Sequence, residues 1–193
     1  MLFRSPGPTW QVVGTGDFYG RGLSDIVLEN INGEVVIWEM MGNTIVGGGA
    51  VSTTSGPDIP GPTWQVLGTG DFTGLRLAAK SLGPAPPLPY GLADIVLQNI
   101  NGEVVIWEMS GTSVIGGGAV QTGGSVENPG PTWRVVGTGD FYGRGRSDIL
   151  LQNDSNSQPL IWEMDGTSVI GGGGIDANPG SGWLVYAPNE LLN

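Results

Sequence analysis

The sequence predicts an all-β fold of tandem four-stranded antiparallel blades, organised like part of a β-propeller. A segment of about 50 residues recurs three times along the chain, which is a period typical of repeat architectures. Each copy contains short runs of β-branched and aromatic residues separated by turn residues. The 193 residues include 36 Gly and 14 Pro, and this composition favours many short elements over long helices.

Each repeat opens with the same run, Pro-Thr-Trp, followed by three further residues and then Gly-Thr-Gly-Asp-Phe. Full copies of this run start at Pro8, Pro62 and Pro131, and a partial copy starts at Pro179. We therefore expect a single repeat domain over residues 1–193. Its repeats lie at approximately 8–59, 60–128 and 129–178, and a partial repeat at 179–193 carries one orphan terminal strand.

Four short strands are expected in each copy. In the first copy they lie at residues 10–13, 25–29 and 34–40, with a last segment at 44–46 that is either a strand or a loop. Asn32-Gly33 separates the second and third runs, and an Asn-Gly pair between apolar runs is a strong hairpin signal. The third run, Val35-Val36-Ile37-Trp38-Glu39-Met40, is apolar on both faces, so each sheet should be covered on both sides.

Four strands in a repeat of about 50 residues indicate propeller blades. About three blades do not close a ring, because propellers typically have 4 to 8. We therefore expect either a homo-oligomer or part of a longer propeller. The second copy also carries an insert at about 75–90 that is rich in proline. This insert is either a lid that contributes to specificity or a tolerated surface insertion.

Composition restricts the chemistry that is open to the chain. There is no Cys and no His, so thiolate metal sites and a Ser-His-Asp triad are excluded. The net charge of -11 argues against nucleic acid and anionic membranes as partners. No apolar run is long enough for membrane insertion, and the N-terminal residues lack the pattern of a signal peptide.

The segment from Gly16 to Asp25, here called an aspartate loop, recurs at residues 139–148 with almost the same residues. This loop and its flanking Trp and Ile-Trp-Glu-Met runs resemble the FG-GAP or VCBS-type repeat family. That family includes the integrin α-subunit propeller and some propeller lectins. The resemblance implies a loop that binds Ca²⁺ through oxygen ligands, as well as an extracellular or cell-surface location.

Only part of that calcium pattern is present. The first and last ligand positions are kept in each copy, by Asp17 and Asp25, Asp71 and Asp94, and Asp140 and Asp148. In the first and third copies, further oxygen ligands are expected between these two aspartates. The residues at those positions are instead Tyr19 or Tyr142 and then Arg21 or Arg144. We expect Arg21 and Arg144 to replace the metal, because a guanidinium has fixed charge and five donors suited to carboxylates. No cofactor is firmly expected, and binding of Ca²⁺ stays open.

The sequence favours a non-enzymatic binding module that recognises a glycan or protein ligand through blade loops. A structural or display segment of a larger surface protein and a calcium-binding repeat are two further functions that fit the pattern. The repeated Glu39, Glu108 and Glu163 do not form the unequal carboxylate pair of a glycosidase, so a glycan-cleaving enzyme is the least favoured function. Aromatic side chains that could contact a sugar, or could instead pack in the core, are Trp38, Trp107, Trp162, Tyr19 and Tyr142.

Overall fold

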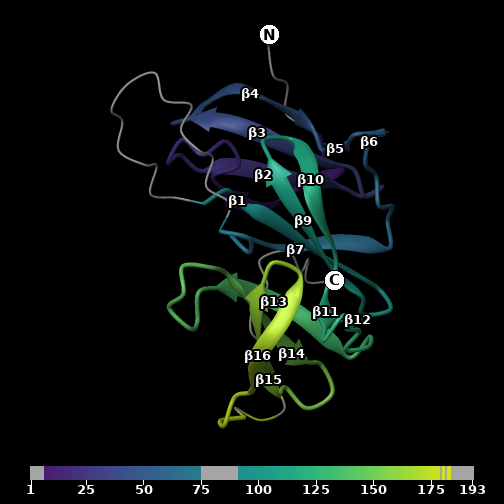
Figure 1. Cartoon of the computed structure of the whole chain (residues 1–193). Coiled ribbons are helices and arrows are strands. Elements are labelled where there is room, and N and C mark those ends of the chain that lie inside the picture. The colour runs from purple at the N-terminus through teal and green to yellow at the C-terminus, as the bar shows by residue number, and fades with distance from the viewer. Residues whose placement is uncertain (1–6, 75–90, 179, 181, 184–193) are drawn as a thin grey trace.

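The computed structural model describes residues 7–74, 91–178, 180, 182 and 183. These residues form sixteen β-strands and no helix, so the expected all-β class is confirmed. The strands make three sheets that follow one another in chain order (Figure 1). The insert at about 75–90 and most of the partial repeat at 179–193 lie outside the described residues. Within the described part of the chain, no helix has the length and apolar character needed to cross a membrane.

The first sheet contains four antiparallel strands in the order in which they occur in the chain. Gly33 closes the tight turn between the second and third of these strands, where its N–H donates to the Asn30 carbonyl oxygen at 2.8 Å. Its φ of 86° is one that glycine adopts without strain. The last strand continues through the glycine triplet, so this segment is a strand and not a loop. The strands are β1 (Trp10–Gly16), β2 (Asp25–Asn30), β3 (Val35–Met41) and β4 (Thr44–Ala50).

The second and third sheets repeat this arrangement in matching register. Trp64 pairs with Asn99 as Trp10 pairs with Asn30 in the first sheet. The second sheet contains β7 (Trp64–Gly70), β8 (Asp94–Asn99), β9 (Val104–Ser110) and β10 (Ser113–Ala119). The third contains β13 (Trp133–Gly139), β14 (Asp148–Asn153), β15 (Pro159–Asp165) and β16 (Ser168–Gly174).

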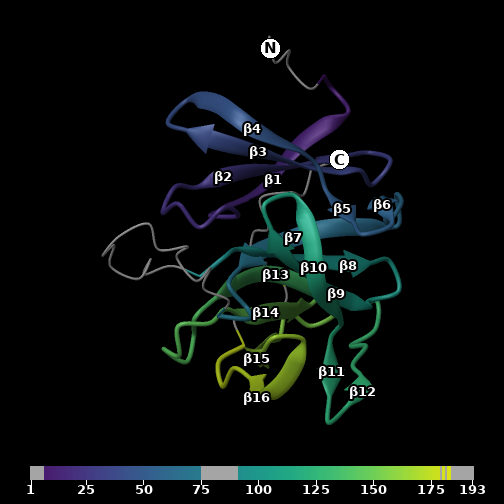
Figure 2. The same ribbon diagram turned by 45° about the horizontal axis from the view of Figure 1, so that its top comes forward.

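Two short hairpins extend the second and third sheets to six strands each. Each hairpin comes from the segment that precedes its sheet, and its first strand pairs in parallel with the last strand of that sheet. Ser52, for example, pairs with Ser113, and Figure 2 shows this hairpin beside the second sheet. The repeat pattern did not predict this addition. The hairpin strands are β5 (Ser52–Thr53), β6 (Gly56–Pro57), β11 (Gln121–Thr122) and β12 (Ser125–Val126).

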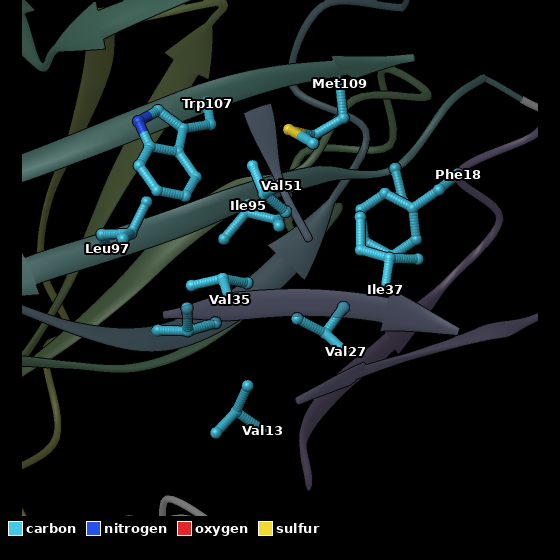
Figure 3. Packing of buried hydrophobic residues seen from close by; sticks show 12 residues of the cluster. Val13, Phe18, Val27, Val35, Ile37, Val51, Ile95, Leu97, Trp107 and Met109 are labelled. Atoms are coloured by element: carbon cyan, nitrogen blue, oxygen red, sulfur yellow. The ribbon is translucent and has the colours of Figure 1, made fainter. Parts of the chain in front are cut away.

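Two hydrophobic cores lie between successive sheets, where β1 packs near β7 and β7 packs near β13. The first core includes Phe18 from the aspartate loop, Ile37 of β3, Ile95 of β8 and Trp107 of β9, and Figure 3 shows them within one cluster. Ile106, the neighbour of Trp107, belongs to the other core, since successive strand residues point to opposite faces. The second sheet is therefore covered on both faces, as its apolar third strand predicted.

Candidate functional site: aspartate loops and inter-sheet clefts

The second aspartate of each loop is buried and ties the loop to the third strand of its own sheet. Asp25 begins β2 with no exposed surface. Its Oδ2 accepts the Phe18 N–H at 3.1 Å and its Oδ1 accepts the Met40 N–H at 2.9 Å. Equivalent pairs of bonds, each at 2.9 or 3.0 Å, join Asp94 to Phe72 and Met109, and Asp148 to Phe141 and Met164.

The first aspartate of each loop accepts backbone N–H groups from within the loop. Asp17 accepts from Arg21 at 2.9 Å and from Gly22 at 2.5 Å. Asp140 accepts from Gly145 at 2.7 Å and Arg144 at 2.9 Å, and these two bonds lower the pKa of its carboxyl group. Asp71 likewise accepts the Gly74 N–H at 2.6 Å. The loop is thus closed through main-chain donors.

The guanidinium of Arg21 lies between two carboxylates and a carbonyl oxygen. Its Nη2 is 3.0 Å from Asp25 Oδ1 and 3.2 Å from the Met40 carbonyl oxygen. Its Nη1 is 3.1 Å from Glu39 Oε1. The sequence placed this cation between Asp17 and Asp25, whereas the structure brings the guanidinium to Asp25 and Glu39 and uses the Arg21 backbone for Asp17. Glu39 is therefore a member of the site that sequence reasoning missed.

Arg144 makes the same set of contacts in the third sheet. Its Nη2 is 3.3 Å from Asp148 Oδ1 and 3.0 Å from the Met164 carbonyl oxygen, and its Nε is 3.1 Å from Glu163 Oε1. Carboxylate and carbonyl oxygens are also the ligands that Ca²⁺ prefers. The residues present do not fit a calcium ion in these two loops, because the guanidinium already occupies the position between the oxygens.

A glycine opposite each of these glutamates leaves room for the carboxylate. A Cβ atom at Gly47, Gly116 or Gly171 would collide with the side chain of Glu39, Glu108 or Glu163 respectively. The glycine triplet therefore allows the glutamate to lie along its own sheet. This recurring Glu and Gly pairing was a signal, visible in the sequence, that could have identified the glutamate.

The middle loop lacks this cation among the described residues. Asp94 is 1% exposed and keeps both backbone donors. Burial raises the pKa of its carboxyl group to about 7, and the nearby carboxylates of Asp71 and Glu108 act in the same direction. The two backbone hydrogen bonds oppose this rise. Within the described ranges, no group of three or more acidic, His or Cys side chains is arranged to hold a metal ion.

The aromatic residues singled out from the sequence lie in different surroundings. Trp107 and Trp162 are each 8% exposed and belong to the two cores. Trp38, on the face of the first sheet turned away from the second, is half-buried. Tyr19 is half-buried with the Arg21 guanidinium 5.5 Å from its ring centre, whereas Tyr142 is exposed. Burial, followed by the Glu39 and Asp25 carboxylates, raises the pKa of Tyr19.

Two equivalent clefts lie where neighbouring sheets meet. The first cleft, between the first and second sheets, has a volume of about 250 Å³, and the second cleft, between the second and third, about 230 Å³. Each is lined by a half-buried Trp, an Asn and an Ile from a turn. Sequence reasoning named the other tryptophan set as candidate ligand residues, although the repeated Pro-Thr-Trp run marked this Trp. The equivalent pairs are Trp64 and Trp133, Asn30 and Asn99, and Ile31 and Ile100.

Comparison with known protein families found no family model that matches the chain, and comparison with curated proteins found no match. The resemblance to FG-GAP or VCBS-type repeats thus depends on the repeated motifs alone.

Proposed function

We propose that this chain is a non-enzymatic binding module of an exported or surface protein, and that it holds carbohydrate in the clefts between neighbouring propeller-like blades. The observation that carries the proposal is the recurrence of one cleft, with matching residues, at both junctions. A structural contact needs no solvent-filled space, but the chain keeps such a space twice. The first strands of the three sheets contact one another in chain order, β1 with β7 and β7 with β13, and this order supports the propeller-like arrangement.

Most side chains that line the clefts are uncharged, the exceptions being Glu29 in the first cleft and Arg134 and Asp154 in the second. This lining suits a hydroxyl-rich ligand. Trp64 and Trp133 present apolar ring surface, while the amides of Asn30 and Asn99 provide hydrogen-bond donors and acceptors. Thr and Gln side chains add further hydrogen-bonding groups to both linings. Volumes of 230 to 250 Å³ lie below the range of about 300–1,000 Å³ for common ligand pockets, which favours a single sugar unit in each cleft.

The rim of each cleft carries an exposed apolar side chain that the fold does not require. Ile31 and Ile100 occupy equivalent turns and are both 68% exposed. Each isoleucine can cover one side of a ligand bound against the tryptophan. The net charge of -11 disfavours polyanionic glycans, so neutral sugars are the expected class.

The decisive experiment is a glycan array, screened with Ca²⁺ and again with a chelator, followed by calorimetric titration of any sugar that binds. We expect selective binding in both conditions and two sites per chain. Trp133→Ala should reduce the stoichiometry to one site, whereas Val126→Ala, at an exposed hairpin residue outside the cleft linings, should leave both sites intact. Ile100→Ser changes only an exposed rim residue and should weaken one site roughly tenfold.

A display or spacer segment is a second candidate, supported by hydrogen bonds that join neighbouring sheets. The Ala93 N–H donates to the Asp17 carbonyl oxygen at 3.0 Å, and the Ser147 N–H donates to the Asp71 carbonyl oxygen at 2.6 Å. Absence of binding on the array in both conditions would favour this function. Binding of a protein with no sugar dependence would contradict the carbohydrate proposal.

A further inference from the structure

One position at the inter-sheet junctions differs chemically between repeats. Glu29 on β2, Gln98 on β8 and Gln152 on β14 occupy the same register position in their strands. Glu29 pairs with Gln11, and Gln98 pairs with Gln65, in the neighbouring strand of the same sheet. The first repeat therefore has a carboxyl group where the other two have a carboxamide.

The carboxamide of Gln98 joins the second sheet to the third. It accepts one backbone hydrogen bond from β13 and donates another to it, as a neighbouring strand does. Its Oε1 accepts the Val135 N–H at 3.0 Å and its Nε2 donates to the Trp133 carbonyl oxygen at 2.8 Å. Nε2 also donates to the Gly102 carbonyl oxygen at 3.2 Å. Gln152 repeats the donation, from Nε2 to the carbonyl oxygen of Trp183 at 3.1 Å. The partners of this amide nitrogen are carbonyl oxygens, which only accept hydrogen bonds. The contact between the sheets therefore needs a donor at this position.

Glu29 makes only half of this contact. Its Oε2 accepts the Val66 N–H at 3.2 Å, as Gln98 Oε1 accepts that of Val135. Its Oε1 is buried and has no hydrogen-bond partner. By the equivalence of the repeats, this oxygen occupies the place of the Gln98 Nε2 donor, which faces the carbonyl oxygen of Trp133. A carboxylate oxygen cannot donate there, and an unpaired buried polar atom is costly.

The described surroundings of Glu29 offer no counter-charge. It shares the first cleft with Thr9, Gln11 and Asn30 from its own sheet and its preceding segment. The second sheet and the segment before it contribute Pro62, Trp64 and Gln65. All six side chains are uncharged, so Glu29 itself is the only charged or titratable side chain that the described residues contribute to this cleft.

We propose that the contact between the first and second sheets is proton-dependent, with Glu29 as the group that responds. When Oε1 of Glu29 carries a proton, it donates to the Trp64 carbonyl oxygen and completes the two-bond contact seen at Gln98. When the proton leaves to solvent, the donor is lost and a negative charge remains in an uncharged cleft. The junction is then weaker, while the junction at Gln98 is unaffected.

The direction of the titration agrees with this geometry. Burial raises the pKa of Glu29 from 4.5 to about 7, and the Val66 N–H opposes the rise. Because the folded pKa is above the unfolded one, the protonated contact stabilises the fold fully below pH 4.5. That contribution is lost as the pH rises through about 7, which makes the junction responsive near neutral pH.

The direct test is ¹³C NMR of the Glu29 side-chain carboxyl group in the intact chain, titrated from about pH 4 to 9. We expect a midpoint near 7, together with a roughly tenfold loss of Val66 amide protection against hydrogen exchange above that pH, after correction for intrinsic exchange. A midpoint at the ordinary value of about 4.5 would overturn the proposal. So would protection of Val66 that does not change with pH.

Two variants make the test specific to this residue. Glu29→Gln copies the carboxamide of the other repeats, so Val66 protection should become independent of pH and stay at the level reached at low pH. Gln98→Glu should bring a pH response to Val135 at the other junction, with a midpoint that also reflects Arg134 and Asp154 in the second cleft. Failure of either variant to move the response would contradict the proposal, and neither result depends on whether the clefts bind sugar.

Discussion

The aspartate loops of the first and third sheets hold a guanidinium against their buried aspartate, whereas the described part of the middle loop does not. Asp25, Asp94 and Asp148 share the same two backbone donors and nearly the same distances. These backbone bonds therefore hold the buried aspartate in the same way in all three sheets. Burial raises the pKa of Asp94, which has no guanidinium beside it among the described residues, to about 7. In the other two loops the guanidinium offers a counter-charge to the buried carboxylate.

The largest effect is expected from removing the cation of one loop. Arg144→Met leaves Asp148, which is fully buried, and Glu163 without their partner. Removing one partner of a buried pair costs about 3–5 kcal/mol, and solvent exposure of Arg144 reduces this to roughly 2–3 kcal/mol. Urea unfolding measures the loss. Arg146→Met removes an exposed pair with Asp165 and should cost under about 1 kcal/mol. Equal losses of stability for the two variants would contradict a larger contribution from the guanidinium at the buried aspartate.

The pH dependence of stability should separate the middle loop from the others. Since the folded pKa of Asp94 is about 7 and its ordinary value is 3.8, the wild-type fold loses stability as the pH rises through about 7. In a Glu29→Gln background, we expect a loss of about 1–3 kcal/mol between pH 5 and 8. Asp94→Asn should abolish this slope in urea unfolding. A slope that persists in Asp94→Asn would assign it to another group.

Glycine substitutions test the role of the glutamates. Gly47→Ala places a Cβ against Glu39 and pushes its carboxylate away from Arg21, so we expect a loss of about 1–2 kcal/mol. Gly116→Ala makes the same collision with Glu108, where no described guanidinium contact is broken. Its loss should be smaller by roughly 0.5–1 kcal/mol. Thermal unfolding of both variants gives the difference, and a larger loss for Gly116→Ala would argue against an arginine-held glutamate.

Calcium should have the smallest effect. Because a guanidinium occupies the first and third loops, adding Ca²⁺ or a chelator should shift the unfolding temperature by less than about 1 °C. Differential scanning calorimetry measures this shift. A stabilisation by Ca²⁺ that survives Asp94→Asn would place the ion in an arginine-containing loop and contradict the proposed replacement.

Local features of this chain could be predicted from sequence, because they depend on neighbouring residues. Alternating apolar runs and the Asn32-Gly33 turn marked the strands, and the spacing from Asp17 to Asp25 marked the loops. The parallel pairing of Ser52 with Ser113 could not be predicted, since it joins residues in different repeats.

The faces taken by the later residues of the first strand in each sheet could not be assigned by simple alternation. A bulge between Val12 and Gly14 shifts the register of β1, and it recurs at the same position in β7 and β13. A bulge changes which face a side chain takes, so period-two patterns no longer assign the following residues. The burial of Trp107 and the partial exposure of Trp64 follow from how the sheets stack, which no single strand specifies.

The hairpins that extend the second and third sheets have a consequence for synthesis. Each hairpin precedes in sequence the strand with which it pairs, so it leaves the ribosome before β10 or β16 is made. The last strand of each of these sheets therefore emerges with a pairing partner for its first one or two residues already present. Unpaired edges are templates for aggregation. The order of the chain thus shortens the time during which the beginning of β10 and of β16 stays unpaired.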